Sequence, residues 1–224
     1  MKERIRKIIL DQGADICGIA NVSGFSDIDK EYRPDTIWNS CKSVIVFGIA
    51  LPKSFYDIQS RLIYAHFITI AKQNVDEISF KAAVEIERSE RIKALPLPCD
   101  DPYEYWQAEK MEGHGLLSMK HAAVLAGIGS IGKNTLLINK KFGNRLTLGA
   151  LLVDSPLDSD ELIGELCIPG CRLCIDSCPS GAISNKTVNQ KKCRLTTYKT
   201  TERGFDTIEC YKCRSVCPLR YGNE

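Results

Sequence analysis

Eight of the eleven cysteines lie in the last quarter of the chain, in two groups that end in Cys-Pro. The first group consists of Cys167, Cys171, Cys174 and Cys178, followed by Pro179. The second group consists of Cys193 and then Cys210, Cys213 and Cys217, followed by Pro218. Bacterial ferredoxins bind two iron–sulfur clusters through runs of the form C-x2-C-x2-C-x3-C-P, which these groups resemble. The spacing therefore predicts two [4Fe–4S] clusters with four thiolates each.

The ligands of each cluster follow from a crossing of the two groups. In bacterial ferredoxins the cysteine before the proline binds the other cluster, because the chain turns away at that point. The first predicted cluster is held by Cys167, Cys171, Cys174 and Cys217. The second is held by Cys178, Cys193, Cys210 and Cys213. Structural zinc and a disulfide framework are the alternatives, but zinc knuckles do not need C-x3-C-P endings.

Composition and length predict a folded protein with one larger and one smaller domain. The chain has 224 residues, of which 44% are hydrophobic, and this is enough to bury a core. The charged segment 1–7 is not followed by a long apolar stretch, so no signal peptide or membrane span is expected. We therefore expect a cytoplasmic protein with reduced thiols. We place the domain boundary between residues 1–160 and 161–224.

The other three cysteines and the charge distribution say less about function than the two cysteine groups do. Cys17 and Cys41 lie in apolar surroundings and are expected in the core, whereas Cys99 lies in a proline-rich segment and is expected to be exposed. The net charge of +2 does not require a nucleic-acid partner. A mild basic excess between residues 186 and 220 fits a solvated face, and an acidic redox partner or an RNA backbone remains the alternative.

Hydrophobic periodicity predicts alternating helices and strands. Residues 3–12 are expected to form a helix, residues 14–20 a strand and residues 43–51 a buried central strand. A long helical tract, expected as two helices, covers residues 55–91, and a proline-rich loop covers 95–102. The remaining predictions are a helix over 103–126, which residues 113–115 can break, and two strands over 135–139 and 145–153 that pair through a turn at 140–144.

Three glycines form a loop in the segment Gly127-Ile-Gly129-Ser-Ile-Gly132. The spacing fits G-x-G-x-x-G, and with Lys133 it nearly fits a phosphate-binding loop, although Asn134 replaces the usual Ser or Thr. Both motifs require a strand before the loop and a helix after it, which is the reverse of the order predicted here. A helix C-cap at Gly127 is therefore the simpler interpretation. The exposed backbone of such a loop can also approach a large ligand closely.

Residues 121–139, which include this loop, resemble a sequence block of the epoxyqueuosine reductase family. Residues 18–20, 33–35, 41–46 and 148–152 resemble further blocks of that family, and the order of the cysteines is similar to its cluster domain. The resemblance implies an α/β (α+β), nitroreductase-like domain that binds cobalamin, followed by a bacterial ferredoxin-like module with two [4Fe–4S] clusters. It also implies that the corrin is lined by Gly129, Ile131, Gly132, Lys133 and Asn134.

The chain departs from the family at the substrate end. The family has a general acid, an aspartate, about fourteen residues before the Ala-Gly pair of the loop, and this position is Gly113 in the present chain. His114 and Glu112 flank it and are the predicted proton donors. The pair Asp100-Asp101 is a further candidate, although acids beside prolines are commonly loop caps. Residues 63–66 only partly match another family segment, and no helical-repeat extension follows the cysteines.

These departures predict a short, divergent paralogue that retains the redox apparatus. We expect an oxidoreductase that passes electrons from two clusters to a corrinoid cobalt and then to an unknown substrate. A low-potential donor such as ferredoxin or flavodoxin is expected to supply the electrons. The alternatives are an electron-transfer protein that reduces another corrinoid protein or a flavin partner, and a non-enzymatic iron–sulfur module. The electron-transfer alternative is motivated by a group of basic residues, Lys191, Lys192, Arg194 and Arg214. A tRNA partner is doubtful on these grounds, and no membrane partner is expected.

Overall fold

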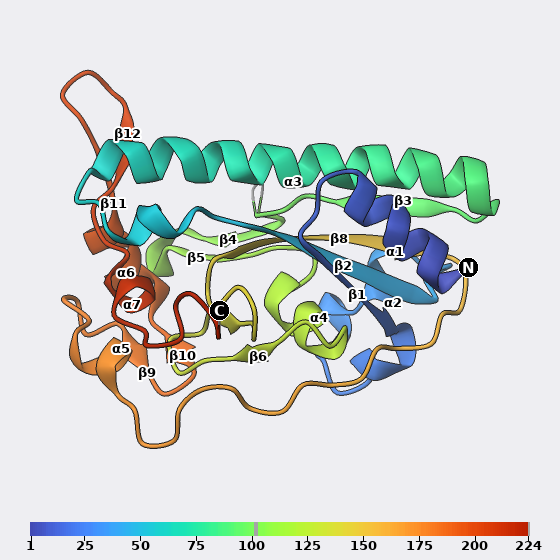
Figure 1. Ribbon diagram of the computed structural model, residues 1–224. Coiled ribbons are helices and arrows are strands. Elements are labelled where there is room, and N and C mark those ends of the chain that lie inside the picture. Colours follow the sequence, from blue (N-terminus) through green and yellow to red (C-terminus); the bar gives the residue numbers. More distant parts are fainter. Residues whose placement is uncertain (101–102, 224) are drawn as a thin grey trace.

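A four-stranded antiparallel sheet forms the centre of the computed structural model, which describes residues 1–100 and 103–223. The strands follow the order β1 (Ile16–Asn21), β2 (Ser43–Ala50), β8 (Leu146–Val153) and β3 (Ala94–Leu97). The predicted helix, first strand and central strand near the N-terminus are confirmed within two residues, with α1 at Lys2–Asp11. The chain has a mixed α/β fold (Figure 1).

Both faces of the sheet are buried, which explains why β2 is apolar along most of its length. Successive side chains of a strand point to opposite faces. Val44 and Val46 pack into one hydrophobic cluster with helix α4 (Met119–Leu125), whereas Ile45 and Phe47 pack into another with α1 and α3 (Arg61–Glu90). Figure 1 shows α1 and α3 on one side of the sheet and α4 on the other.

Helix α3 is a single helix of 30 residues, so the prediction of two helices over 55–91 is wrong. The Ser60 hydroxyl accepts a hydrogen bond from the Ile63 N–H and caps its start, and Arg91 ends it in the left-handed region with φ of 58°. No glycine or proline interrupts the segment between these residues. Val75, Ala82 and Ile86 lie on its inner face against the sheet and hold the helix straight along it.

The remaining elements are short. The helices are α2 (Pro34–Ile37), α5 (Leu173–Asp176), α6 (Gln190–Thr197) and α7 (Lys212–Ser215). The 3-10 turns are Val22–Phe25, Lys30–Tyr32, Lys53–Tyr56 and Ala108–Lys110. Four two-stranded antiparallel pairs complete the set: β4 (Tyr105–Gln107) with β5 (Glu112–His114), β6 (Ser130–Ile131) with β7 (Leu137–Ile138), β9 (Ile183–Ser184) with β10 (Thr187–Val188), and β11 (Tyr198–Thr200) with β12 (Asp206–Ile208).

Two predicted elements between residues 95 and 126 are wrong. The proline-rich loop begins with strand β3, where Pro96 is tolerated because β3 is an edge strand whose outer side needs no backbone donor. The helix over 103–126 is mostly the hairpin of β4 and β5, and α4 occupies its end. Aromatic residues such as Tyr105 and Trp106 favour strands, and the glycines near His114 disfavour a helix.

The predicted pairing of residues 135–139 with 145–153 is also wrong. Strand β8 pairs with β2 and β3 in the central sheet, whereas β7 pairs with β6 next to it in the chain. Only an isolated bridge between Asn139 and Gly143 closes the predicted turn. An apolar strand as long as β8 buries more surface between two other strands than in a local hairpin, and this decides its partners.

The three cysteines outside the two groups are all buried. Cys17 and Cys41 lie in the core as predicted, and burial raises the pKa of Cys17 to about 12 and that of Cys41 to about 11. The prediction that Cys99 is exposed is wrong, since its side chain lies in the cluster formed by α1, α3 and the sheet. The Asp76 carboxylate accepts a hydrogen bond from the Cys99 N–H at 2.8 Å and fixes the backbone there.

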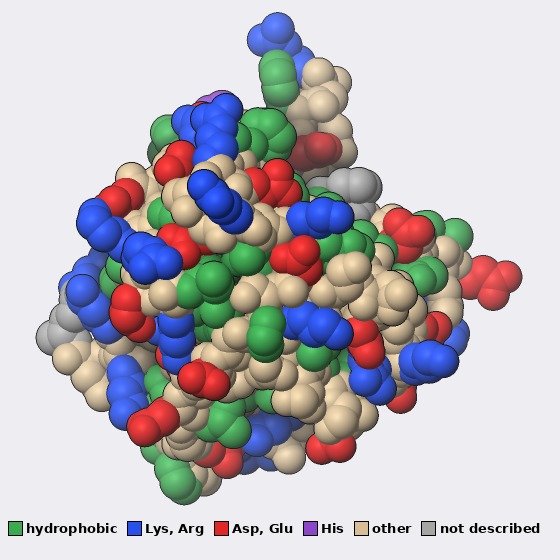
Figure 2. Space-filling view, turned by 90° about the vertical axis from the view of Figure 1, so that its right-hand side faces the viewer, with side chains coloured by type: hydrophobic (Ala, Val, Ile, Leu, Met, Phe, Trp, Pro, Cys, Tyr) green, Lys and Arg blue, Asp and Glu red, His purple; other side chains and the backbone are tan. Residues whose placement is uncertain are grey.

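The surface at the end of the molecule away from the cysteine groups mixes both signs of charge. Figure 2 shows this face, on which Lys and Arg side chains alternate with Asp and Glu. Among the described helices, none combines the length and the apolar composition that crossing a bilayer requires. The division at residue 160 stays a prediction.

Candidate redox and ligand-binding site

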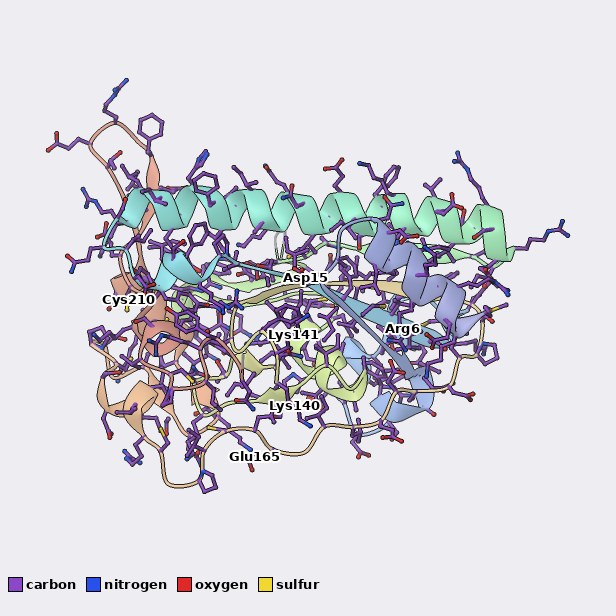
Figure 3. All side chains as sticks on the ribbon, viewed as in Figure 1. Arg6, Asp15, Lys140, Lys141, Glu165 and Cys210 are labelled. Atoms are coloured by element: carbon purple, nitrogen blue, oxygen red, sulfur yellow. The ribbon has the colours of Figure 1, made fainter. Side chains whose placement is uncertain are left out.

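Helices α5, α6 and α7 gather the two cysteine groups at one end of the central sheet (Figure 1). The Asn189 side chain accepts a hydrogen bond from the Lys192 N–H at 2.9 Å, caps the start of α6, and thereby positions Cys193 one turn later. Figure 3 labels Cys210 at this end, whereas Arg6 of α1 lies toward the opposite end. Each of these short helices carries one cysteine, Cys174, Cys193 or Cys213, and the other five cysteines lie in the loops beside them.

Electrostatic interactions among the thiols are consistent with the two quartets predicted from the sequence. Burial raises the pKa of Cys213 to about 11, and Cys193, Cys210 and Cys178 add to the increase. Burial also raises the pKa of Cys217, as do Cys167, Cys174 and Cys171. Thiols that raise one another's pKa lie close together, because each thiolate repels the next. The fold thus brings together both sets of four predicted ligands.

Four thiols in each quartet form a donor set that fits an iron–sulfur cluster. Iron–sulfur clusters are held by cysteine thiolates, and the positive iron centres offset the repulsion that otherwise keeps these thiols protonated. The pKa of Cys178 is lowered: burial raises it, but hydrogen bonds from the Ser180 side chain and from backbone N–H groups outweigh that effect. In the part of the chain that the structure describes, no three His, Cys, Asp or Glu side chains converge as on a single metal ion.

The glycine loop lies against the two cysteine groups. Gly127 ends α4 with a φ of 68°, so the interpretation of this residue as a helix C-cap is confirmed, and the order of helix before strand is that predicted. The Lys133 ammonium donates to the Cys171 carbonyl at 2.8 Å, and the Asn134 side-chain amide donates to the Cys213 carbonyl at 3.0 Å. The two polar residues of the loop therefore fix the backbone of both cysteine groups.

Lys133 and Asn134 also line a small cavity whose wall includes all four thiols of the first quartet. None of the five residues predicted to line a corrin, Gly129, Ile131, Gly132, Lys133 and Asn134, lies on the wall of the much larger second cavity. That wall instead includes Leu136 and Leu137, which directly follow the loop. The predicted contact between the loop and a corrin stays a prediction.

The larger cavity has a volume of about 1700 Å³ and extends from the second cysteine quartet to α4 and the β4–β5 hairpin. Its wall includes Cys193, Cys210 and Cys213, and no cysteine of the first quartet. The second quartet is therefore the inner one, next to the cavity. A ligand in the cavity would lie directly beside it.

His114 and Glu112, the two predicted proton donors, occupy different positions. His114 lies on the cavity wall, and its ring centroid is 5.8 Å from that of Tyr32. Glu112 pairs with Gln107 in the hairpin and is not among the cavity-lining residues. Asp100 lies on the wall but is ion-paired with Lys72, and Asp101 lies outside the described residues. Of these acids and bases, His114 has the geometry to meet a ligand.

Gly113, which the resemblance predicts to stand where the family has its aspartate, is closely surrounded. A Cβ atom at this residue would lie 2.9 Å from the Tyr103 ring. The Gly113 N–H donates to the Gln190 side chain at 3.1 Å, and the same side chain donates back to the Gly113 carbonyl at 3.2 Å. The hairpin is thereby fastened to α6, the helix that carries Cys193. An aspartate would displace Tyr103 and disturb this contact.

Sequence reasoning missed several residues of the cavity wall. Lys120 and His121 both lie on it, and the Ser118 hydroxyl is 2.7 Å from His121 Nδ1. Burial lowers the pKa of His121, and the charge of Lys120 lowers it further. Tyr32 also lines the cavity, although its loop gives no motif in the sequence. A lysine and a histidine at the start of the helix that precedes the glycine loop were the available signal.

The basic surface predicted beside the clusters is only half present. Lys191 and Lys192 are exposed, whereas Arg194 is enclosed by the rings of Tyr103 and Trp106, each 5.2 Å from its guanidinium carbon, and by Tyr198 at 5.9 Å. Arg214 donates to the Asn144 carbonyl at 2.6 Å and lines the cavity. The two arginines thus serve the interior, and they do not form an outer docking face.

Curated proteins with similar sequences are epoxyqueuosine reductases. That of Bacillus cereus is 27% identical over 220 residues, which cover 89% of this chain and 54% of that protein. That of Bacillus subtilis is 26% identical over 217 residues, with 91% and 54% coverage. The chain is a relative of the epoxyqueuosine reductases. It spans about half the length of these relatives, and no protein-family model matches it.

Solved structures give the same relationship at the level of the fold. Epoxyqueuosine reductase from Streptococcus thermophilus superposes with a TM-score of 0.68 at 18% identity, covering 100% of this chain and 68% of that one. An epoxyqueuosine reductase with an epoxyqueuosine-modified tRNA-Tyr stem loop gives 0.66 at 19% identity, with 98% and 65% coverage. A reductive dehalogenase, described with a mechanism for B12-dependent dehalogenation, gives 0.60 at 18% identity, with 97% and 29% coverage.

Proposed function

We propose that this relative of the epoxyqueuosine reductases is an oxidoreductase that uses two [4Fe–4S] clusters and a corrinoid held in the large cavity. In this proposal residues 1–160 form a nitroreductase-like domain around the corrinoid, and residues 161–224 form a ferredoxin-like module. The quartet of Cys167, Cys171, Cys174 and Cys217 receives electrons from a low-potential donor such as ferredoxin or flavodoxin. The quartet of Cys178, Cys193, Cys210 and Cys213 passes them to the cavity. A cytoplasmic location is part of the same proposal.

One observation carries the proposal: three thiols of the inner quartet form part of the wall of a cavity of about 1700 Å³. Ligand pockets for drug-sized molecules commonly measure about 300–1,000 Å³, so this cavity suits a larger cofactor together with a substrate. Two groups that exchange electrons must approach closely, and a ligand in this cavity would touch the inner quartet. The outer quartet faces a separate cavity and is suited to receive electrons from outside.

An unsatisfied polar atom on the wall supports the fit of a corrinoid. The Asn144 side chain is 1% exposed and lines the cavity, and its Oδ1 has no hydrogen-bond partner among the described residues. A buried acceptor without a donor costs about 1–3 kcal/mol, so it favours a ligand that supplies one. Corrinoids carry amide side chains around the ring, and these are donors of the required kind.

The protein's own residues supply orientation and a proton. When bound, the corrinoid supplies reducing chemistry at its metal, whereas the protein supplies the surroundings. His114 faces the cavity from β5 and is placed to hold or donate a proton. The Gln190 side chain, which is hydrogen-bonded to Gly113, keeps this strand against α6 and so sets the distance between His114 and the inner quartet.

Anaerobic purification with hydroxocobalamin present tests the proposal. The absorption spectrum should contain corrin bands together with cluster bands, and iron analysis should give about eight atoms per chain. Gly115 lines the cavity, and a Cβ at this residue would meet nothing closer than 3.7 Å. Gly115→Trp should therefore fill the cavity and abolish corrinoid binding without loss of iron.

Gly164→Trp is the matched control, because a Cβ at Gly164 meets nothing within 4 Å and the residue is not among those lining the cavity. This variant should bind the corrinoid as the wild type does. Absence of corrin bands in a wild-type protein that carries its full iron content would reject the corrinoid part of the proposal. Equal corrinoid binding by both tryptophan variants would reject the cavity as its site.

Epoxyqueuosine-modified tRNA is the substrate to test first. A relative with the same fold has been solved with an epoxyqueuosine-modified tRNA stem loop, so the doubt about a tRNA partner is not supported. We propose that this chain acts on the same modified nucleoside. Complementation of a strain that lacks the queuosine-forming reductase tests this, with His114→Gln as the negative control. A complementing wild type supports the substrate, and failure of a well-expressed, cluster-loaded protein rejects it.

A further inference from the structure

Lys120 is a cation without a partner on the wall of the large cavity. It is the second residue of α4 and half-buried. No hydrogen bond or ion pair joins its ammonium to any part of the chain that the structure describes, although lysines elsewhere, such as Lys7 and Lys81, form ion pairs on the surface. A partly desolvated charge is costly unless it is paired, so this position is built for a counter-charge that the protein does not supply.

The carboxylates of the cavity do not serve Lys120. The described aspartates on the wall are Asp27, Asp29, Asp100 and Asp206. Of these, Asp100 is the one whose charge acts on Lys120, and it is already ion-paired with Lys72. Asp206 is 3.5 Å from the Thr200 hydroxyl in the β11–β12 hairpin. The protein therefore leaves the charge of Lys120 largely uncompensated.

A second cation adds to the positive potential at the same wall. Arg214 lines the cavity, and its charge lowers the pKa of Lys120 further, after burial as the larger cause. The neighbours of Arg214 are the Asn144 carbonyl and the tyrosines Tyr56 and Tyr64, none of them a carboxylate. A cluster on the inner quartet would offset Arg214, which follows Cys213 in the chain. Lys120 would still face the cavity without a counter-ion.

We infer that Lys120 is the anchor of an anion-binding subsite, which takes a phosphate or carboxylate group of the ligand in the large cavity. The inference deepens the proposed function and rests on it, because it assumes that the ligand is bound in the same large cavity. Two sources could supply the group: the phosphate in the nucleotide tail of a corrinoid, or an anionic group of the substrate. A hydrogen bond between charged partners is roughly twice as strong as a neutral one, so a single lysine contributes measurably.

Titration calorimetry of inorganic phosphate on the anaerobic, cluster-loaded protein tests the subsite. Lys120→Gln should weaken phosphate binding about tenfold or more, whereas Lys120→Arg should retain it. Lys93→Gln is the matched control, since Lys93 is exposed and is not among the residues lining the cavity. The inference is overturned if the wild type does not bind phosphate or if Lys120→Gln binds it equally well.

A comparison of hydroxocobalamin with cobinamide, which lacks the phosphate-bearing tail, separates the two sources. Weaker binding of cobalamin but not of cobinamide by Lys120→Gln assigns the anion to the corrinoid. Unchanged binding of both, with phosphate binding weakened, assigns it to the substrate. A wild-type protein that binds phosphate through Lys120 but takes up no corrinoid would overturn the proposed cofactor and leave the anion subsite standing.

Discussion

The eight predicted cluster ligands all lie between residues 167 and 217, whereas the residues that line the large cavity come from segments between Asp27 and Arg214. Short helices and caps position the cysteines, so that part of the site is encoded in local spacing. The cavity depends on how the sheet, α3, α4 and the β4–β5 hairpin meet. Under the proposed function, a substitution at the cysteine end is therefore expected to remove a cluster, whereas one at the cavity end is expected to change ligand binding or turnover.

The largest effect is expected from Cys193→Ala, which tests whether the lone cysteine belongs to the inner quartet. The substitution removes one of four predicted ligands, so iron should fall from about eight to about four atoms per chain. Iron analysis and electron paramagnetic resonance of the reduced protein measure this. Cys17→Ala is the control, because Cys17 is buried in the core and is not among the residues lining the cavity beside the inner quartet. Full iron content in Cys193→Ala would remove Cys193 from the ligand set.

At the cavity end, His114→Gln should reduce turnover strongly and leave the clusters unchanged. General acid–base groups contribute about 10²–10⁴-fold to rate, and a loss of at least 10²-fold is expected. Glu112→Gln is the matched control and should have little effect, since Glu112 is not on the cavity wall. Rates are measured on epoxyqueuosine-modified stem loop with the iron content of each variant. Equal losses in both variants would argue that the hairpin, and not His114, is the sensitive element.

A smaller effect is expected when an aspartate is placed at Gly113. Because its Cβ would lie 2.9 Å from the Tyr103 ring, Gly113→Asp should lower stability by about 1–3 kcal/mol. Combining it with Tyr103→Ala should restore part of the loss, since the clash is relieved. Denaturant unfolding of the two single variants and the double variant measures the coupling. Additive losses would show that Tyr103 does not determine which residues fit at this position.

The smallest effect is expected far from both sites, at Asp160. Burial raises the pKa of this carboxyl, but Lys2, the Ile19 N–H and Arg6 outweigh it, so the pKa is lowered in the folded protein. The Arg6 guanidinium, labelled in Figure 3, donates a hydrogen bond to Asp160 Oδ1 at 2.9 Å. A lowered pKa gives stability that is present above the usual value of about 4 and is lost as pH falls below it.

Asp160→Asn should therefore lower the thermal midpoint at neutral pH, with a difference from the wild type that shrinks below about pH 4. Thermal unfolding between pH 7 and pH 3 follows this difference. Asp158→Asn is the control, since Asp158 is exposed and has no ion pair among the described residues. A difference independent of pH would mean that the ion pairs of Asp160 do not set its contribution.

Sequence patterns predicted the parts of the molecule that depend on near neighbours. The first helix and the two first strands were found within two residues, and the C-cap at Gly127 was recognised. Longer-range choices were missed, such as the pairing of β8 with β2 and β3 and the hairpin formed by β4 and β5. Their stability comes from surfaces distant in the chain, which local propensity does not describe.

By itself, the sequence determined the eight cysteines, their division into two quartets and the relationship to the epoxyqueuosine reductases, because each depends on residue type and spacing. The tertiary structure decided which quartet faces the cavity, and it placed His114 and Lys120 on the same wall. It also turned Arg194 and Arg214 inward. A side chain's neighbours depend on the packing of remote elements, and burial and counter-charge follow only once that packing is known.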